Sequence, residues 1–181
     1  GEADEVSSEL GRHGATLQEF TRAHPLAARL LQGQQAQGLL ATGHHQGIGV
    51  GLQHLARLAL DHLLRQAPEL AEQRSALYAA ALLHDIGHGP FSHSGEEMFG
   101  LRHEVWSGRL IREHPELCGR LEAERPGLAG EVADLLEHGR HGCPPIAALV
   151  SSQLDCDRLD YLLRDSHSTG TSYGQLDLER I

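Results

Sequence analysis

Apolar residues recur every three or four positions along most of the chain, which is the spacing of amphipathic helices. In 48–68 the apolar residues at positions 52, 55, 59 and 63 share one face, and Pro68 marks the expected end. The run 69–85 is rich in Ala and Leu, has an acidic first turn, and is followed by the stop signal Gly87. Further helices are expected over 16–31 with a break at Pro25, 96–114 as one or two helices, 115–124, 127–139 and 144–166.

No stretch alternates between apolar and polar residues as a half-buried strand does, and no internal repeat is found. The pattern therefore predicts an all-α protein built as a helical bundle. We expect residues 1–15 to form a polar lead-in, and residues 16–181 to form one domain in which 33–47 is partly loop.

Composition narrows the class of protein. The chain has 181 residues, 40% of them hydrophobic, and a net charge of −10, which argues against a general nucleic-acid binder. The cysteines are odd in number and form no CxxC pair, which favours a reducing compartment. Because no apolar run reaches the length of a membrane span, we expect a cytoplasmic protein without a membrane partner.

The segment "LLHDIGHGPFSH" (82–93) gathers histidines and an aspartate at the end of an apolar helix. A divalent cation can hold a carboxylate and a neutral imidazole together and offset the cost of burying them. His84 and Asp85 are therefore candidate metal ligands, and the glycines after them allow a tight turn that brings His88 and His93 back. The alternative is a helix-terminal histidine that interacts with the helix dipole, followed by a polar loop.

A second cluster lies in "LDCDRLDYLLRD" (154–165). Positions 150, 154, 157 and 161 have the spacing of one buried stripe, so Asp157 falls where an apolar residue is expected. A metal shared with the first cluster would neutralise this carboxylate, and pairing with an arginine of a neighbouring helix is the alternative. Arg158, Tyr161 and Asp165 form a polar ridge beside it that suits phosphate and sugar.

The motifs "HDIGHGPFSH", "RHEVWSG" and "LDCDRLDYLLRDSHSTGTSYG" resemble, in the same order, those of the HD superfamily of metal-dependent phosphohydrolases. The likeness is greatest to the dGTPase-like deoxynucleoside triphosphate triphosphohydrolases and covers about residues 24–181. It implies a helical HD domain in which water attacks the α-phosphorus of a deoxynucleotide and releases nucleoside and triphosphate.

The resemblance also implies roles for individual residues. His84, Asp85 and Asp157 would bind a divalent ion (Mn, Fe, Ni, Zn or Mg), and His88, His93 and His103 would contact phosphates or transfer protons. Glu96 stands where the family carries an acidic partner for a catalytic histidine, and Arg158, Tyr161 and Asp165 would contact phosphate and sugar. His103-Glu104 is alternatively a plain helix N-terminal pair.

The chain departs from the family at its first motif. The usual R-F-E-H is replaced by "GHHQGIGVGLQHLA", so that Ile48 or Gln46, depending on the alignment, stands at the metal histidine's position. His45 is then the candidate fourth ligand, and we expect weaker metal binding and turnover. Family enzymes extend further, so the chain is expected to match the N-terminal part of a longer, homo-oligomeric enzyme. Hydrolysis of monophosphates or other phosphoesters, and a non-catalytic domain that binds nucleotide or a partner, remain open.

Overall fold

The computed structural model describes residues 46–88, 94, 96–97, 100 and 102–172, and every regular element among them is helical. The prediction of an all-α fold is confirmed. No helix in this part of the chain is both long and apolar enough to cross a membrane. The elements are α5 (Gln46–Leu63), the 3-10 helix η1 (Pro68–Gln73), α6 (Arg74–Leu83), α8 (His103–Glu113), α9 (Pro115–Glu124), α10 (Leu128–His138), α11 (Pro144–Val150) and α12 (Cys156–Thr169).

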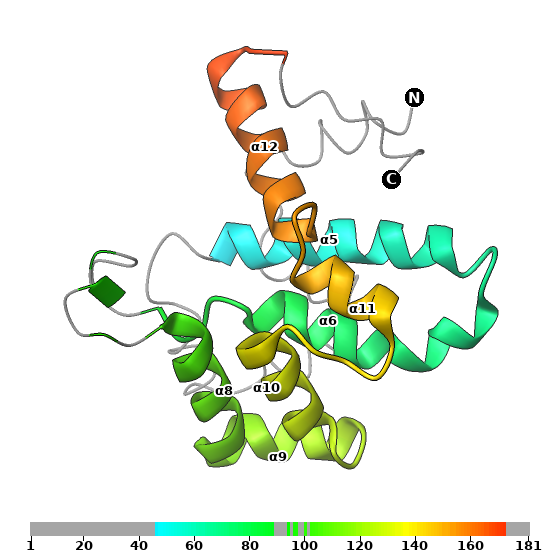
Figure 1. Ribbon diagram of the computed structural model, residues 1–181, viewed down its shortest axis with the longest axis vertical. Coiled ribbons are helices and arrows are strands. Elements are labelled where there is room, and N and C mark those ends of the chain that lie inside the picture. The colour runs from blue at the N-terminus through cyan, green and yellow to red at the C-terminus, as the bar shows by residue number, and fades with distance from the viewer. Residues whose placement is uncertain (1–45, 89–93, 95, 98–99, 101, 173–181) are drawn as a thin grey trace.

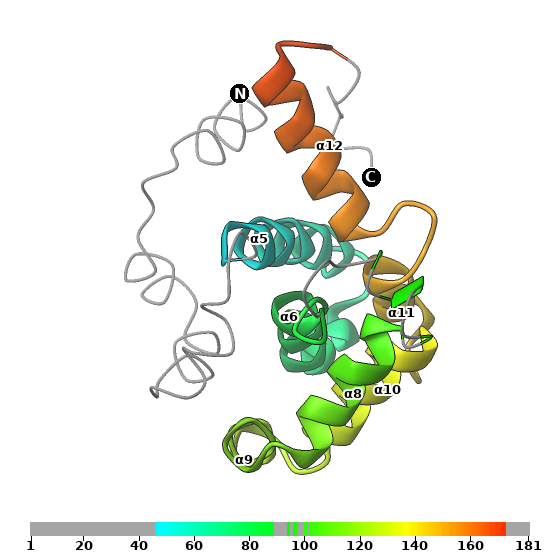
Figure 2. The same cartoon turned by 90° about the vertical axis from the view of Figure 1, so that its left-hand side faces the viewer.

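Helix α6 is at the centre of the described fold and packs against α5, α10 and α11. Helices α8 and α10 form the most extensive helix pair, and α9 joins them at one end (Figures 1 and 2). Helix α12 packs on α5 at its first turns and then extends away from α6 (Figure 1). This arrangement brings the C-terminal end of α6 close to both α8 and α12.

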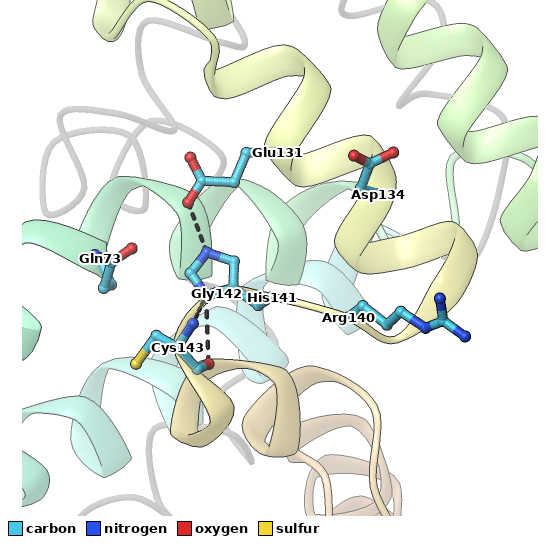
Figure 3. A pocket seen from close by; sticks show the side chains of 7 residues that line it. All are labelled: Gln73, Glu131, Asp134, Arg140, His141, Gly142 and Cys143. Atoms are coloured by element: carbon cyan, nitrogen blue, oxygen red, sulfur yellow. Dashed lines mark hydrogen bonds and ion pairs between the residues drawn. The ribbon is translucent and has the colours of Figure 1, made fainter.

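The link between α10 and α11 is fixed by a buried histidine. The His141 side chain is only 4% exposed and its Nε2 donates to Glu131 Oε1 over 2.6 Å, while its Nδ1 accepts from the Cys143 amide (Figure 3). This histidine is buried although it lies in a loop, because Glu131 lies on the helix that the loop folds back onto. The two bonds fix the loop beside a cavity of about 490 Å³ lined by Gln73, Glu131, Asp134, Arg140, His141, Gly142 and Cys143.

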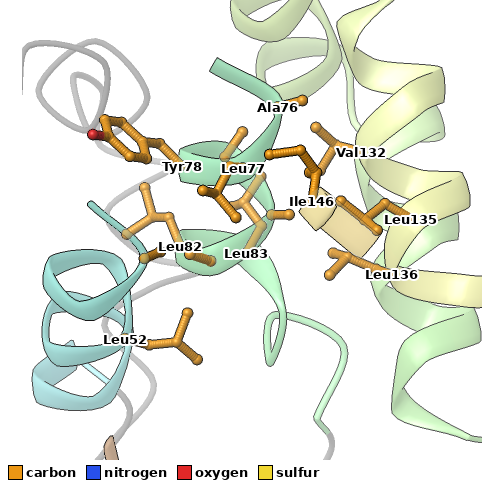
Figure 4. Close-up of a cluster of buried hydrophobic side chains, with 14 of the residues drawn as sticks. Leu52, Ala76, Leu77, Tyr78, Leu82, Leu83, Val132, Leu135, Leu136 and Ile146 are labelled. Carbon is orange, nitrogen blue, oxygen red and sulfur yellow. The ribbon is translucent and has the colours of Figure 1, made fainter. Parts of the chain in front are cut away.

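The core is made of small and aliphatic side chains. All eight residues from Ala76 to Leu83 on α6 are buried, and the alanines among them let neighbouring helices approach closely. Figure 4 shows the leucines of α6 between Leu52 on one side and Val132, Leu135 and Ile146 on the other. Because α6 is enclosed in this way, the position of its last residue is well defined, and that residue is followed by His84.

Two of the expected helices are shorter than predicted: one ends earlier and the other begins later. Helix α5 ends at Leu63, five residues before Pro68, and the run 69–85 divides into η1 and α6. Pro68 does not end a helix but occupies the first turn of η1, where its missing amide has no cost. The acidic residue of the first turn, Glu69, therefore belongs to the 3-10 helix.

The single helix expected over 144–166 is wrong, since 151–155 separate α11 from α12. The Asp155 side chain accepts from the amide of Arg158 over 2.9 Å and also from that of Ser152 over 3.3 Å. Asp155 is thus the N-cap of α12, and the chain bends where a continuous helix was expected. Leu154, predicted to be buried, lies in the bend with 63% of its surface exposed.

This new helix start changes which face of α12 is buried. Cys156, Leu159 and Asp160 point into the protein, whereas the Asp157 side chain is 44% exposed. The buried stripe predicted through position 157 is therefore wrong. The fully buried carboxylate is that of Asp160, and it pairs with Arg164 over 2.6 Å.

Asp160 gives a pH-dependent contribution to stability. Burial raises the pKa of its carboxyl from 3.8 to about 6, against the opposing charge of Arg164, and Oδ1 has no hydrogen-bond partner among the described residues. Because the folded state holds this proton more tightly, the contribution is favourable below pH 4 and is lost as the pH rises to 6. We expect Asp160→Asn to gain about 3 kcal/mol relative to the parent protein between pH 4 and pH 7.

Urea unfolding of both proteins in EDTA across that pH range measures the difference. Asp165→Asn removes an exposed carboxylate from the same helix and is the matched control. A difference between Asp160→Asn and the parent protein that stays constant with pH would contradict the prediction.

Candidate metal centre and active site

His84 stands at the C-cap of α6, and one of its ring nitrogens is committed to the backbone. Its Nδ1 lies 3.0 Å from the Ala81 carbonyl oxygen, which can only accept. Nδ1 therefore carries a proton, and in the neutral ring Nε2 has a free lone pair. This backbone bond orients the imidazole, as an outer hydrogen bond does for a metal-binding histidine.

Two carboxylates converge on Nε2 of His84. Asp85 Oδ2 lies 3.1 Å away, and Asp157 Oδ1, from the first turn of α12, lies 3.6 Å away. The structure thus brings together the three side chains predicted to bind metal, although Asp157 is more than 70 residues from the other two in sequence.

The surroundings of His84 favour a positive charge between these groups. Nε2 is buried and makes no well-directed hydrogen bond to any described residue, although both carboxylates are near. Burial alone would lower the pKa of His84, but Asp157 and Asp85 raise it to about 10. Burial would raise the pKa of Asp85, but His84, followed by His88 and His103, lowers it to about 2. A lone pair facing two carboxylates is stabilised by a proton or by a cation, so the donor set fits a divalent metal.

The second oxygen of Asp85 faces a pair of stacked histidines. Oδ1 lies 3.5 Å from His88 Nε2 and 3.9 Å from His103 Nε2, and the two rings stack 3.9 Å apart at 19°. One ligand atom from each of Asp85, His88 and His103 lies within 4.8 Å of the others, which is compact enough to hold an ion. Asp85 therefore lies between the predicted metal ligands and the predicted proton-transfer residues.

Glu96 interacts with both stacked rings. Its Oε1 accepts from His103 Nδ1 over 2.6 Å and lies 3.5 Å from His88 Nδ1. The bond to Nδ1 places the second nitrogen of His103 on the side of Asp85, as in a carboxylate–histidine pair used for proton transfer. Glu104 also lies near His103 Nδ1, at 3.7 Å, but is bonded to Arg102.

The predicted substrate residues lie on the exposed side of α12. Arg158, Tyr161 and Asp165 are all exposed, and an Arg158 guanidinium nitrogen donates to the Gln153 carbonyl over 2.8 Å. The other two predicted site residues, His93 and the possible fourth ligand His45, lie outside the described residues.

Two residues near the site were not singled out by sequence reasoning. Burial raises the pKa of the thiol of Cys156, the neighbour of Asp157, to about 12, so this thiol is neutral at physiological pH in the metal-free protein. Ser107 is fully buried and bonds to the backbone beside His84. A serine within a helical pattern gives no sequence signal for such a contact, because the partner comes from another helix.

Comparison with known proteins identifies the same region. The family model described as "HD domain" matches residues 52–165. The YwfO protein of Bacillus subtilis (strain 168) is 41% identical over 133 residues, which cover 73% of this chain and 30% of YwfO. The deoxynucleoside triphosphate triphosphohydrolase SAMHD1 homolog of Dictyostelium discoideum is 30% identical over 139 residues, which cover 68% of this chain and 27% of that protein.

A solved structure agrees with these matches. The crystal structure of a phosphohydrolase from Bacteroides thetaiotaomicron superposes with a TM-score of 0.55 and 33% identity, covering 93% of this chain and 42% of that one. The chain thus spans less than half of the solved structure and less than a third of the two curated relatives. The family and this neighbour support a hydrolase with a divalent metal, as the motifs predicted. The chain belongs to the HD domain family.

Proposed function

We propose that the protein hydrolyses deoxynucleoside triphosphates to nucleoside and triphosphate with a divalent metal ion. The observation that carries the proposal is the convergence of Asp85 and Asp157 on the free ring nitrogen of His84, at 3.1 and 3.6 Å. The relative named as a deoxynucleoside triphosphate triphosphohydrolase supports the choice of substrate. Because the chain spans only part of its relatives, the proposal concerns the protein that carries this domain.

His84, Asp85 and Asp157 hold the ion in this proposal, with His45 as a fourth ligand. Nitrogen and carboxylate donors of this kind suit Mn, Fe, Ni or Zn better than Mg. A bound divalent ion supplies a Lewis acid that polarises the phosphate and activates water. The hydrogen bond from His84 Nδ1 to the Ala81 carbonyl keeps the other ring nitrogen directed at the ion.

Proton transfer is assigned to the groups around Asp85. His103 is oriented by Glu96 through the 2.6 Å bond to its Nδ1, which directs Nε2 toward Asp85, and we assign to this nitrogen the exchange of a proton with water or the leaving oxygen. His88 stacks on His103 and lies near the same two carboxylates, those of Asp85 and Glu96. His93 is proposed to contact the phosphates.

The exposed side of α12 is proposed to bind the substrate. Arg158 follows the metal ligand Asp157 directly and offers a guanidinium that matches two phosphate oxygens. Its present partner is a single backbone carbonyl, Gln153 O, which a phosphate can replace. Tyr161 and Asp165, one and two turns further along, are proposed to contact the sugar.

Product analysis tests the substrate and the reaction. The protein is incubated with Mn²⁺ and each deoxynucleoside triphosphate, and tripolyphosphate is measured, with His84→Ala as the control. Tripolyphosphate released by the parent protein alone supports the proposal. Inorganic phosphate released from nucleoside monophosphates would instead indicate a phosphomonoesterase of the same family. No product together with retained nucleotide binding would indicate a non-catalytic HD domain.

Arg158 gives a separate test of substrate binding. We expect Arg158→Ala to raise KM about 10–100-fold, since a hydrogen bond to a charged group contributes about 1.5–3 kcal/mol. Metal affinity should not change, because Arg158 has no part in the ligand set. Arg120→Ala, which removes an arginine paired with Glu116 on α9, is the matched control. An unchanged KM in Arg158→Ala would remove this residue from the phosphate site.

A further inference from the structure

A single buried hydroxyl joins the end of α6 to the first turns of α8. Ser107 Oγ donates to the His84 carbonyl over 3.0 Å and accepts from the Gly87 amide over 2.9 Å. Both backbone groups belong to the turn that follows α6, and the C-terminal end of a helix leaves its last carbonyls without partners within the helix. Ser107 therefore satisfies two groups of the turn at once.

The same turn is in direct backbone contact with α8. A Cβ atom at Gly87 would lie 2.2 Å from the His103 carbonyl oxygen and 2.4 Å from the Ser107 amide nitrogen. The missing side chain at Gly87 is what allows this approach, and the Ser107 hydroxyl holds the two segments at that distance.

This contact connects the two halves of the candidate site. The turn carries His84, Asp85 and His88, whereas His103 is the first residue of α8. The 3.9 Å stacking of His88 on His103 and the 3.9 Å separation of Asp85 Oδ1 from His103 Nε2 both depend on how α8 sits against the turn. Both hydrogen bonds of the Ser107 hydroxyl end on backbone atoms and not on these side chains, so its influence passes through the backbone.

We propose that Ser107 is a positioning residue, whose hydroxyl fixes the turn after α6 so that His84 and Asp85 point toward Asp157 and His88 stacks on His103. The inference rests on the proposed function, because that function makes His84 and Asp85 metal ligands and His103 a proton-transfer residue. Ser107 is a better candidate than other buried polar groups because each of its two bonds ends on the backbone of the metal-binding turn.

The test compares Ser107→Ala with Ile111→Val, a buried residue one turn further along α8 that has no bond to the turn. Two readouts are used: the affinity for Mn²⁺ and, in the metal-free protein, the ring nitrogen chemical shifts of His84. We expect Ser107→Ala to lower the affinity about 10–100-fold, as the loss of an outer partner does at metal sites, and to shift the His84 resonances. Ile111→Val should change neither, even where it lowers Tm equally.

Normal affinity and unchanged His84 resonances in Ser107→Ala would overturn the inference. Equal changes in Ile111→Val at the same loss of Tm would also overturn it, because the effect would then be general loosening. If Ser107→Ala does not fold, Ser107→Cys takes its place, since a thiol fills the space but bonds weakly. If the parent protein binds no Mn²⁺, the proposed function fails, and the His84 resonances alone decide the role of Ser107.

Discussion

Asp157→Asn is expected to lower the affinity for Mn²⁺ by about a hundredfold or more, because loss of an outer partner alone costs about 10–100-fold at metal sites. The Asp157 carboxylate lies 3.6 Å from the free nitrogen of His84 and is the proposed ligand that α12 contributes. An amide keeps the shape of the side chain but removes its charge, so the ion would lose one of its two carboxylates.

Turnover should fall together with the affinity for Mn²⁺. If the lost carboxylate contributed about 3 kcal/mol to stabilising the ion and the transition state, the rate would drop about a hundredfold even at saturating Mn²⁺. Titration of the metal and steady-state release of tripolyphosphate measure the two effects separately.

Asp155→Asn is the matched control for this experiment. Asp155 lies two residues away and also carries a carboxylate, but it caps α12 through bonds to the amides of Ser152 and Arg158. Asparagine is as good a cap as aspartate, so the helix is preserved while one negative charge is lost. We expect the affinity for Mn²⁺ to stay within about twofold of the parent protein. Equal losses in the two variants would mean that net charge, and not ligation by Asp157, determines metal binding.

The helices that the sequence predicted best are those whose ends are marked by a proline or a glycine. Helices α9 and α10 lie where their patterns placed them, because Pro115 opens the first and Gly139, with a φ of 61°, ends the second. The apolar positions of such helices fall on one side of the helix, so spacing alone locates the buried face.

The error at α12 arose from giving hydrophobic spacing more weight than capping. The run "VSSQLD" contains two serines and an aspartate, which favour turns and N-caps over helix interiors. Once Asp155 is taken as the N-cap, the buried face passes through Cys156, Leu159 and Asp160, and Asp157 lies at its edge. The convergence of Asp157 with His84 was predicted even so, because the resemblance to the HD superfamily assigns both residues to one metal site.

The contact between the metal-binding turn and α8 was beyond sequence reasoning. Gly87 was interpreted as a helix stop, and its closest neighbours are atoms of His103 and Ser107, 16 and 20 positions later. Packing of one backbone against another leaves no periodic signal in the sequence, because it depends on a missing side chain and not on a recurring apolar one.

Gly87→Ala is expected to have the largest effect on stability of any small substitution in the described site. The added Cβ would meet backbone atoms at 2.2 and 2.4 Å, and backbone cannot rotate away as a side chain can. Helix α8 must then move away from α6, which also separates His103 from His88. Overpacking of this kind costs about 3 kcal/mol, or about 6–12 °C in Tm for a chain of this size.

Activity should fall further than stability alone explains. A displacement of about 1 Å between reacting groups can cost about a hundredfold in rate, so the variant is assayed well below its Tm. Gly130→Ala is the matched control, since Gly130 lies within α10 and a Cβ there would meet nothing within 4 Å. That substitution should raise stability by up to about 1 kcal/mol, because alanine favours helix, and leave activity unchanged. A Gly87→Ala protein with the Tm and turnover of the parent would mean that α8 is not held against the turn. The claim that this contact connects His84 to His103 would then be wrong.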